Sequence, residues 1–130
     1  MVLVDSSVWI EYLRRPASET GLELDRLLGE KAVVLTGVVM VEVLLGARSK
    51  QDFERLASLL GPIPFEEVDK KAWSDTAELG MRLRRSGTPI PLSDLQIASV
   101  ALQGNHSLFS LDKHFGNVPG LSIYEPTSRR

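Results

Sequence analysis

Short apolar runs alternate with longer amphipathic segments along this chain. Continuous apolar runs that end at polar or turn residues are typical of buried strands. The pattern predicts strands at residues 1–4, 31–35, 107–110 and 121–124, with a brief extended segment at 63–65. The first run is too apolar for an exposed edge, so we expect it inside a sheet.

Between these runs, apolar residues three and four positions apart predict helices. The predicted helices cover residues 8–15, 18–30, 38–47, 53–60, 69–86 and 93–104. We expect Trp9 and Tyr12 in the core and Trp73 in a buried stripe. Ser93 and Gln96 have the spacing of a capping box at the start of the last helix. The alternation of strands and helices favours an α/β fold with a parallel sheet and right-handed crossovers.

The composition is that of a globular protein and excludes several classes. Of the 130 residues, 43% are hydrophobic and 25% are charged, which suits a single domain over 1–130 with 125–130 as a loose tail. The absence of cysteine excludes disulfides and thiolate metal sites. Fifteen basic and 17 acidic residues give a net charge of −2, which excludes a uniformly basic nucleic-acid coat but not a local basic rim.

Nothing in the pattern indicates a membrane protein. No charged segment precedes the apolar run 1–4, and no apolar run approaches the roughly 18 residues of a membrane span. We therefore expect no signal peptide, no membrane segment and a cytoplasmic location.

Two aspartates follow predicted strands. Asp5 comes directly after the first strand, and Asp112 comes two residues after the run 107–110. Ligands of open parallel sheets collect just beyond the carboxyl ends of the strands. The alternatives are that Asp5 or Ser6 caps the following helix and that Asp112 is a turn residue or a cap. The sequence leaves both alternatives open.

Glu42 is the polar exception in an otherwise apolar helix. Val38, Val39 and Leu45 share its helix face. An ionised glutamate on such a face is costly unless it is paired or binds a metal. This favours a functional role over that of a solvated surface residue.

A fourth acid, Asp94, lies at the start of the last predicted helix. A carboxylate at a helix N-terminus is stabilised there, which is its structural interpretation. However, Ile97 and Ala98, which begin the buried stripe, lie three and four residues further on. We therefore expect Asp94 to point inward at the mouth of the helix.

Carboxylates gathered at one sheet edge would repel one another unless a cation neutralised them. Oxygen ligands without histidine or cysteine indicate Mg²⁺ or Mn²⁺, and such a site can hydrolyse phosphodiesters. The predicted metal-binding and catalytic residues are Asp5, Glu42, Asp94 and Asp112. Ser6 and Ser110 would orient Asp5 and the pocket.

Other polar residues are weaker candidates for a functional role. Arg82, Arg84 and Arg85 end a helix, where they suit its dipole, but they could also contact an RNA backbone. His106 and His114 have no partner at ligand spacing, so we expect both to be bystanders.

Five segments carry a resemblance to a known family. They are VLVDSSVWI at 2–10, VEVLLGA at 41–47, PLSDLQIA at 91–98, LFSLDKHF at 108–115 and VPGL at 118–121. In this order they resemble the PIN-domain ribonucleases, and more narrowly the VapC-type toxins of bacterial toxin–antitoxin pairs. The resemblance covers essentially the whole chain.

The resemblance implies a three-layer α/β/α sandwich with a mostly parallel sheet, forming one PIN-like nuclease domain. It assigns the metal site to Asp5, Glu42, Asp94 and Asp112, and it matches Ser6 and Ser110 to positions where the family has Ser or Thr. It further implies an endoribonuclease that needs Mg²⁺ or Mn²⁺ and cuts transfer RNA or ribosomal RNA, a homodimer, and a cognate antitoxin that blocks the site.

Three alternatives remain. The same metal core could serve a DNA-directed nuclease, or the domain could be a catalytically silent binding module. An acidic Mg²⁺ pocket could also belong to a small-molecule phosphatase or a receiver-like switch, although no lysine ends a late strand. A serine-hydrolase elbow, a P-loop and a dinucleotide glycine fingerprint are absent from the sequence.

Overall fold

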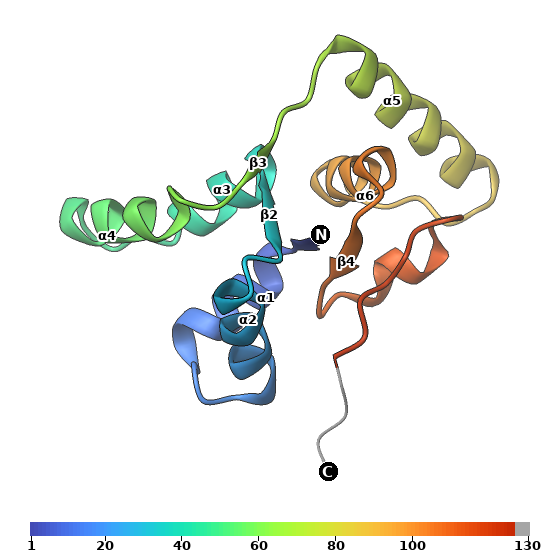
Figure 1. Ribbon diagram of the computed structural model, residues 1–130. Coiled ribbons are helices and arrows are strands. Elements are labelled where there is room, and N and C mark those ends of the chain that lie inside the picture. The colour runs from blue at the N-terminus through green and yellow to red at the C-terminus, as the bar shows by residue number, and fades with distance from the viewer. Residues whose placement is uncertain (127–130) are drawn as a thin grey trace.

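A parallel sheet forms the centre of the computed structural model, which describes residues 1–126 (Figure 1). Its strands are β1 (Val2–Val4), β2 (Val33–Thr36), β3 (Phe65–Glu66) and β4 (Ser107–Phe109). They lie in the order β3-β2-β1-β4, and each neighbouring pair is parallel. Of the predicted tail at 125–130, residues 127–130 lie outside the described part.

Helices fill the connections between the strands. They are α1 (Ser6–Arg14), α2 (Glu19–Gly29), α3 (Gly37–Leu44), α4 (Lys50–Leu60), α5 (Lys70–Arg85), α6 (Leu92–Gly104) and the 3₁₀ helix η1 (Lys113–Asn117). None of these helices combines the length and hydropathy that a membrane crossing requires.

The direction of the crossovers explains the layers. The chain steps from β1 to β2 to β3 through α1–α4, and then returns across the sheet to β4 through α5 and α6. Right-handed crossovers in opposite directions place their helices on opposite faces. Figure 1 shows α1 and α2 on one side of the strands and α5 and α6 on the other. The predicted α/β class and the three-layer sandwich are therefore confirmed.

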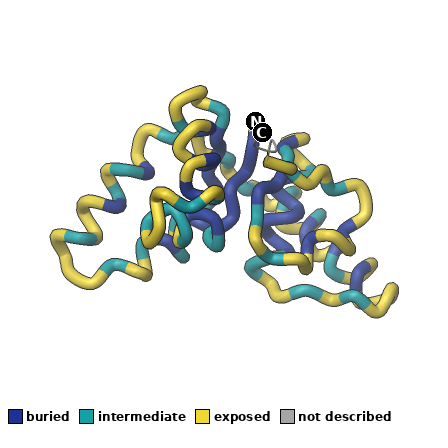
Figure 2. The backbone as a smooth tube through the Cα atoms, turned by 90° about the horizontal axis from the view of Figure 1, so that it is seen from below, coloured by how far each residue is buried: buried dark blue, intermediate teal, exposed yellow. Residues whose placement is uncertain are grey.

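The core lies where the sheet meets these helices. β1 is buried along its whole length between β2 and β4, as its apolar run predicts. Trp9 from α1 and Ile97 from α6 are fully buried against the sheet layer. Figure 2 shows that buried segments gather in the middle of the molecule, whereas exposed segments form its periphery.

Three local predictions are wrong. α6 begins at Leu92 after Pro91, without a side-chain cap, so Ser93 and Gln96 do not form a capping box. The predicted strand at 121–124 is reduced to one bridge between Leu108 and Ile123, beyond the end of the four-stranded sheet. Trp73 is 46% exposed, because only part of the apolar stripe of α5 faces α6.

Candidate active site

The central strands β1 and β4 end side by side at one edge of the sheet. Val4 is in register with Phe109, and the backbone N–H of Asp5 donates to the Phe109 carbonyl at 2.9 Å. This pairing brings the residues after both strands together, at the edge where open α/β sheets bind ligands.

The Asp5 carboxylate is buried at this edge among hydroxyl groups. Asp5 is 4% exposed, and its Oδ2 accepts hydrogen bonds from Ser7 Oγ and Ser110 Oγ, each at 2.8 Å. Both hydroxyl groups therefore hold the same oxygen of Asp5. Asp5 occupies the N-cap position of α1, but its side chain accepts no capping hydrogen bond. The carboxylate is thus not a helix cap.

Two serines that follow Asp5 have different roles. Ser6 Oγ donates to Glu42 Oε1 at 2.8 Å, so its side chain orients Glu42, another of the predicted acids, and not Asp5. Ser7, which no sequence pattern marks as a site residue, holds Asp5 and also accepts the backbone N–H of Leu111 at 3.0 Å. Glu42 is half-buried on α3.

A second acidic group lies at the start of α6 and of η1. Single ligand atoms of Asp94, Asp112 and His114 lie within 4.8 Å of one another. His114 Nδ1 is 3.2 Å from Asp94 Oδ2 and 3.1 Å from Asp112 Oδ1. His114 is therefore not a bystander in structural terms. His106 instead contacts Glu66 at 2.7 Å, outside this group.

The electrostatics show that the acids face one another. Burial, above all, raises the pKa of Asp94, and the charges of Asp112 and Asp5 raise it further, whereas His114 opposes this shift. The pKa of His114 is raised in turn, chiefly by its hydrogen bond to Asp94. Asp5, Asp94 and Asp112 thus share one electrostatic environment.

The structure does not gather all four predicted acids into one compact group. Glu42 connects to the group through Ser6, next to Asp5, and it lies outside the compact set formed by Asp94, Asp112 and His114. Asp112 also caps η1 by accepting the backbone N–H of His114 at 2.9 Å.

The three arginines of the predicted basic rim lie at the end of α5. Arg82, Arg84 and Arg85 are exposed in the last turn of α5, and no ion pair joins them to the four acids within residues 1–126.

The donor set is suited to a hard divalent cation. Its carboxylate oxygens are the ligands that Mg²⁺ and Mn²⁺ prefer. Within residues 1–126, no basic side chain forms an ion pair with Asp5 or Glu42, and the imidazole of His114 is the basic group nearest Asp94 and Asp112. A bound cation would therefore supply the charge that the surrounding side chains do not.

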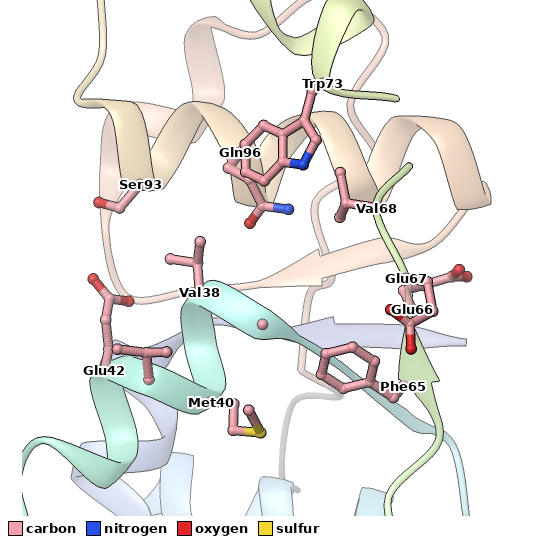
Figure 3. A pocket seen from close by; sticks show the side chains of 12 residues that line it. Val38, Met40, Glu42, Phe65, Glu66, Glu67, Val68, Trp73, Ser93 and Gln96 are labelled. Atoms are coloured by element: carbon pink, nitrogen blue, oxygen red, sulfur yellow. The ribbon is translucent and has the colours of Figure 1, made fainter. Parts of the chain in front are cut away.

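Two hollows meet at Glu42. The first has a volume of about 520 Å³ and lies among α3, β3, α5 and α6 (Figure 3). The second, of about 800 Å³, is bordered by α1, α3 and α4 and is lined by Ile10, Leu13, Arg14, Glu42, Val43, Gly46, Arg48, Asp52, Arg55 and Leu56.

The fold and the site together define an α/β domain with an acidic cluster beyond its central strands. The sequence model of the PIN domain matches residues 2–121, so this chain belongs to the PIN domain family. The resemblance drawn from the five sequence segments is thereby confirmed.

Known proteins are similar to this chain in sequence or in fold. A VapC ribonuclease of Mycobacterium bovis is 27% identical over 134 residues, covering 100% of both chains. Among solved structures, VapBC2 from Rickettsia felis, bound to a promoter DNA fragment, has a TM-score of 0.80 at 20% identity and covers 95% of this chain and 98% of that one. VapC20 of Mycobacterium tuberculosis, a sarcin-ricin loop cleaving toxin, has a TM-score of 0.70 at 15% identity and covers 96% and 100%.

Proposed function

We propose that this protein is a divalent-metal-dependent endoribonuclease that acts as the toxin of a toxin–antitoxin pair. The observation that carries the proposal is the buried Asp5 carboxylate, which hydroxyl groups orient and no cation from residues 1–126 neutralises. The names of the full-length relatives support ribonuclease activity. Asp94 and Asp112 add further negative charge beside it.

Four acids would hold Mg²⁺ or Mn²⁺: Asp5, Glu42, Asp94 and Asp112. When bound, such a cation polarises a phosphodiester and makes water a better nucleophile near neutral pH. Ser7 and Ser110 fix the Asp5 carboxylate, and Ser6 fixes Glu42. One of these carboxylates would accept the proton of the attacking water.

The partners follow from the same family. We propose an RNA substrate of the transfer or ribosomal class, in which unpaired loops expose the bases. A cognate antitoxin would cover the hollow beside α1, α3 and α4, where Leu13 and Leu56 offer apolar contacts and Arg14 and Arg55 offer charge. Because Glu42 lies at the edge of this hollow, an occupant would block the acids. We further propose that 1–130 forms one domain and works as a cytoplasmic homodimer.

The test is cleavage of purified total RNA by wild type and by Asp5→Asn, each with Mg²⁺, Mn²⁺ or EDTA. We expect discrete fragments that require metal and disappear with Asp5→Asn. Asp75→Asn is the matched control, because it also removes one aspartate charge but lies on the exposed side of α5, paired with Lys71. Equal cleavage by Asp5→Asn would overturn the proposal.

Two other outcomes identify the alternatives. Faster cleavage of single-stranded DNA than of RNA would indicate a DNA-directed nuclease. No cleavage by folded protein that is free of antitoxin would indicate a catalytically silent binding module.

A further inference from the structure

The helix α5 has an apolar face that its main neighbour does not cover. Its buried side chains, Thr76, Leu79 and Leu83, lie on the side of α6, against which α5 chiefly packs (Figure 1). Trp73 and Met81 lie on a different face and are 46% and 49% exposed. Large apolar side chains that are exposed together on one face are typical of an interaction surface.

These exposed residues form a regular stripe. Trp73, Ala77 and Met81 are each four positions apart, so they share one face of the helix, and Ala77 is exposed as well. We call these three residues the α5 stripe. Ala77 lies at the middle of α5, which runs over Lys70–Arg85. The stripe is therefore centred on a small side chain, with a large one at each end.

An apolar hollow lies beside this stripe. Trp73 borders the hollow of about 520 Å³, and Figure 3 shows Met40 and Phe65 across it. Most of the remaining lining is apolar and includes Val38, Val41 and Val68. A two-fold interface pairs one patch with the same patch of a second copy. A ridge next to a hollow suits this symmetry, because each copy can place its ridge at the other's hollow.

Charges are divided between the two ends of α5. Glu66 and Glu67 border the hollow just before the helix, and Asp69 is its N-cap. Two lysines follow these acids, but Lys71 is already paired with Asp75. The last turn instead carries only basic charges, those of Arg82, Arg84 and Arg85. Two antiparallel α5 helices would place the basic end of each beside the acidic segment of the other, whereas parallel helices would place like charges together.

We propose that a second copy of this chain covers the α5 stripe, with the two α5 helices antiparallel and Ala77 near the two-fold axis. The small Ala77 side chains let the helices approach closely. Met81 of each copy lies against Trp73 of the other at the mouth of the hollow, and Arg84 and Arg85 approach Glu66 and Glu67. This inference rests on the homodimer proposed above and gives it an interface, which uses neither Asp5 nor the hollow beside α1, α3 and α4.

The first test places charges at the proposed axis and measures self-association by sedimentation equilibrium. Ala77→Glu and Ala77→Lys should each weaken the dimer by more than about a hundredfold, because like charges then face one another. An equimolar mixture of the two variants should associate again, which a folding defect would not produce. Gln51→Glu and Gln51→Lys, at an exposed position of α4, are the matched controls and should leave the dimer unchanged.

A second test uses the absence of cysteine from the sequence. Ala77→Cys introduces one thiol per chain, and residues beside a two-fold axis lie close to their own copies. We expect Ala77→Cys to form a disulfide-linked dimer when copper phenanthroline is the oxidant, because the two thiols can reach each other. Gln51→Cys should remain uncrosslinked at the same concentration. Trp73→Ala should weaken the dimer at least about tenfold, as expected for a tryptophan at the centre of an interface.

The possible failures have different meanings. A dimer that persists in both charged Ala77 variants would show that the copies associate through another surface, so this interface would be wrong and the homodimer would stand. A wild-type protein that is monomeric at every concentration would overturn both. Neither result bears on the ribonuclease function, which is tested by metal-dependent cleavage that requires Asp5.

Discussion

Two buried carboxylates in this molecule have opposite surroundings. Glu23 on α2 is 1% exposed, and Arg26 Nη2 donates to its Oε2 at 2.8 Å. The Tyr124 hydroxyl donates to the same oxygen. Asp5 is 4% exposed, but its Oδ2 is held by the hydroxyls of Ser7 and Ser110. One acid is thus neutralised by its own chain, whereas the other is only oriented.

The difference separates a structural acid from one that we propose to be functional. Burying a carboxylate is costly unless an opposite charge or several hydrogen bonds accompany it. Around Glu23, the guanidinium of Arg26 meets this requirement and links α2 to the segment that carries Tyr124. Around Asp5, the neighbouring Asp94 and Asp112 add repulsion instead. If Asp5 binds a metal ion as proposed, this arrangement gives up stability for function, as binding sites commonly do.

The largest expected effect is on cleavage by the acid variants. Asp94→Asn and Glu42→Gln should each lower the cleavage rate by more than about a hundredfold, beyond the loss typical of groups that only orient a metal ligand. Neither should lower the melting temperature of the metal-free protein, because each change removes one of several crowded negative charges. Cleavage assays and thermal unfolding measure the two effects.

Asp112→Asn should retain part of the activity, since the fourth acid would act mainly on a second metal ion and asparagine can still cap η1. Full activity of Asp94→Asn would show that the site is assigned wrongly.

The structural acid should behave in the opposite way. Glu23→Ala leaves the Tyr124 hydroxyl and the Arg26 guanidinium without their shared acceptor, and it should lower the free energy of unfolding by about 1–3 kcal/mol. Cleavage per folded molecule should not change. Urea unfolding measures the first effect.

Glu30→Ala is the control, because Glu30 is 56% exposed yet binds the same Arg26, and its loss should cost no more than about 0.5 kcal/mol. Loss of cleavage in folded Glu23→Ala protein would remove the distinction between the two acids.

Much of this site can be predicted because its acids interrupt apolar patterns. Asp5 ends a buried run, and Glu42 interrupts an apolar helix, so each stands out without knowledge of its neighbours. The fold class follows from the same runs. His114 does not stand out, because its contact with Asp94 joins residues 20 positions apart that only the packing of η1 beside α6 brings together.

Other features depend on details that periodicity does not contain. Helical spacing identifies an apolar stripe on α5 but not how far α6 covers it, so it misplaces Trp73. Ser7 lies in the first turn of a helix, where a serine is typical of capping, and only the junction of β1 with β4 shows that it holds Asp5. Gln96 matches a capping box by spacing, yet the N-cap of α6 is Pro91, two residues before Ser93, and Gln96 is buried.

Adding a metal ion tests the contrast between the acids around Asp5 and the paired acid Glu23. At about ten times its dissociation constant, an ion that binds only the folded state adds about 1.4 kcal/mol of stability. We expect Mn²⁺ or Mg²⁺ to raise the melting temperature of wild type and of Glu23→Ala, but not that of Asp94→Asn. EDTA alone should leave the metal-free protein unchanged. An equal rise in Asp94→Asn would place the ion elsewhere.

The smallest expected effect is the titration of His114. Its pKa should lie above the ordinary value of 6.5 in metal-free protein, because Asp94 accepts its hydrogen bond and Asp112 adds negative charge. A raised pKa stabilises the folded state below pH 6.5, and this contribution disappears as the pH rises through the folded-state pKa. The imidazole is 54% exposed, so the change in stability should be slight, and NMR titration of its ring protons is the more sensitive measurement. Asp94→Asn should return the midpoint toward 6.5, whereas Asp75→Asn should not move it. Mg²⁺ should lower the midpoint in wild type, because a cation among the acids repels the imidazolium. A metal-free midpoint at or below 6.5 would mean that these acids do not face His114 in solution.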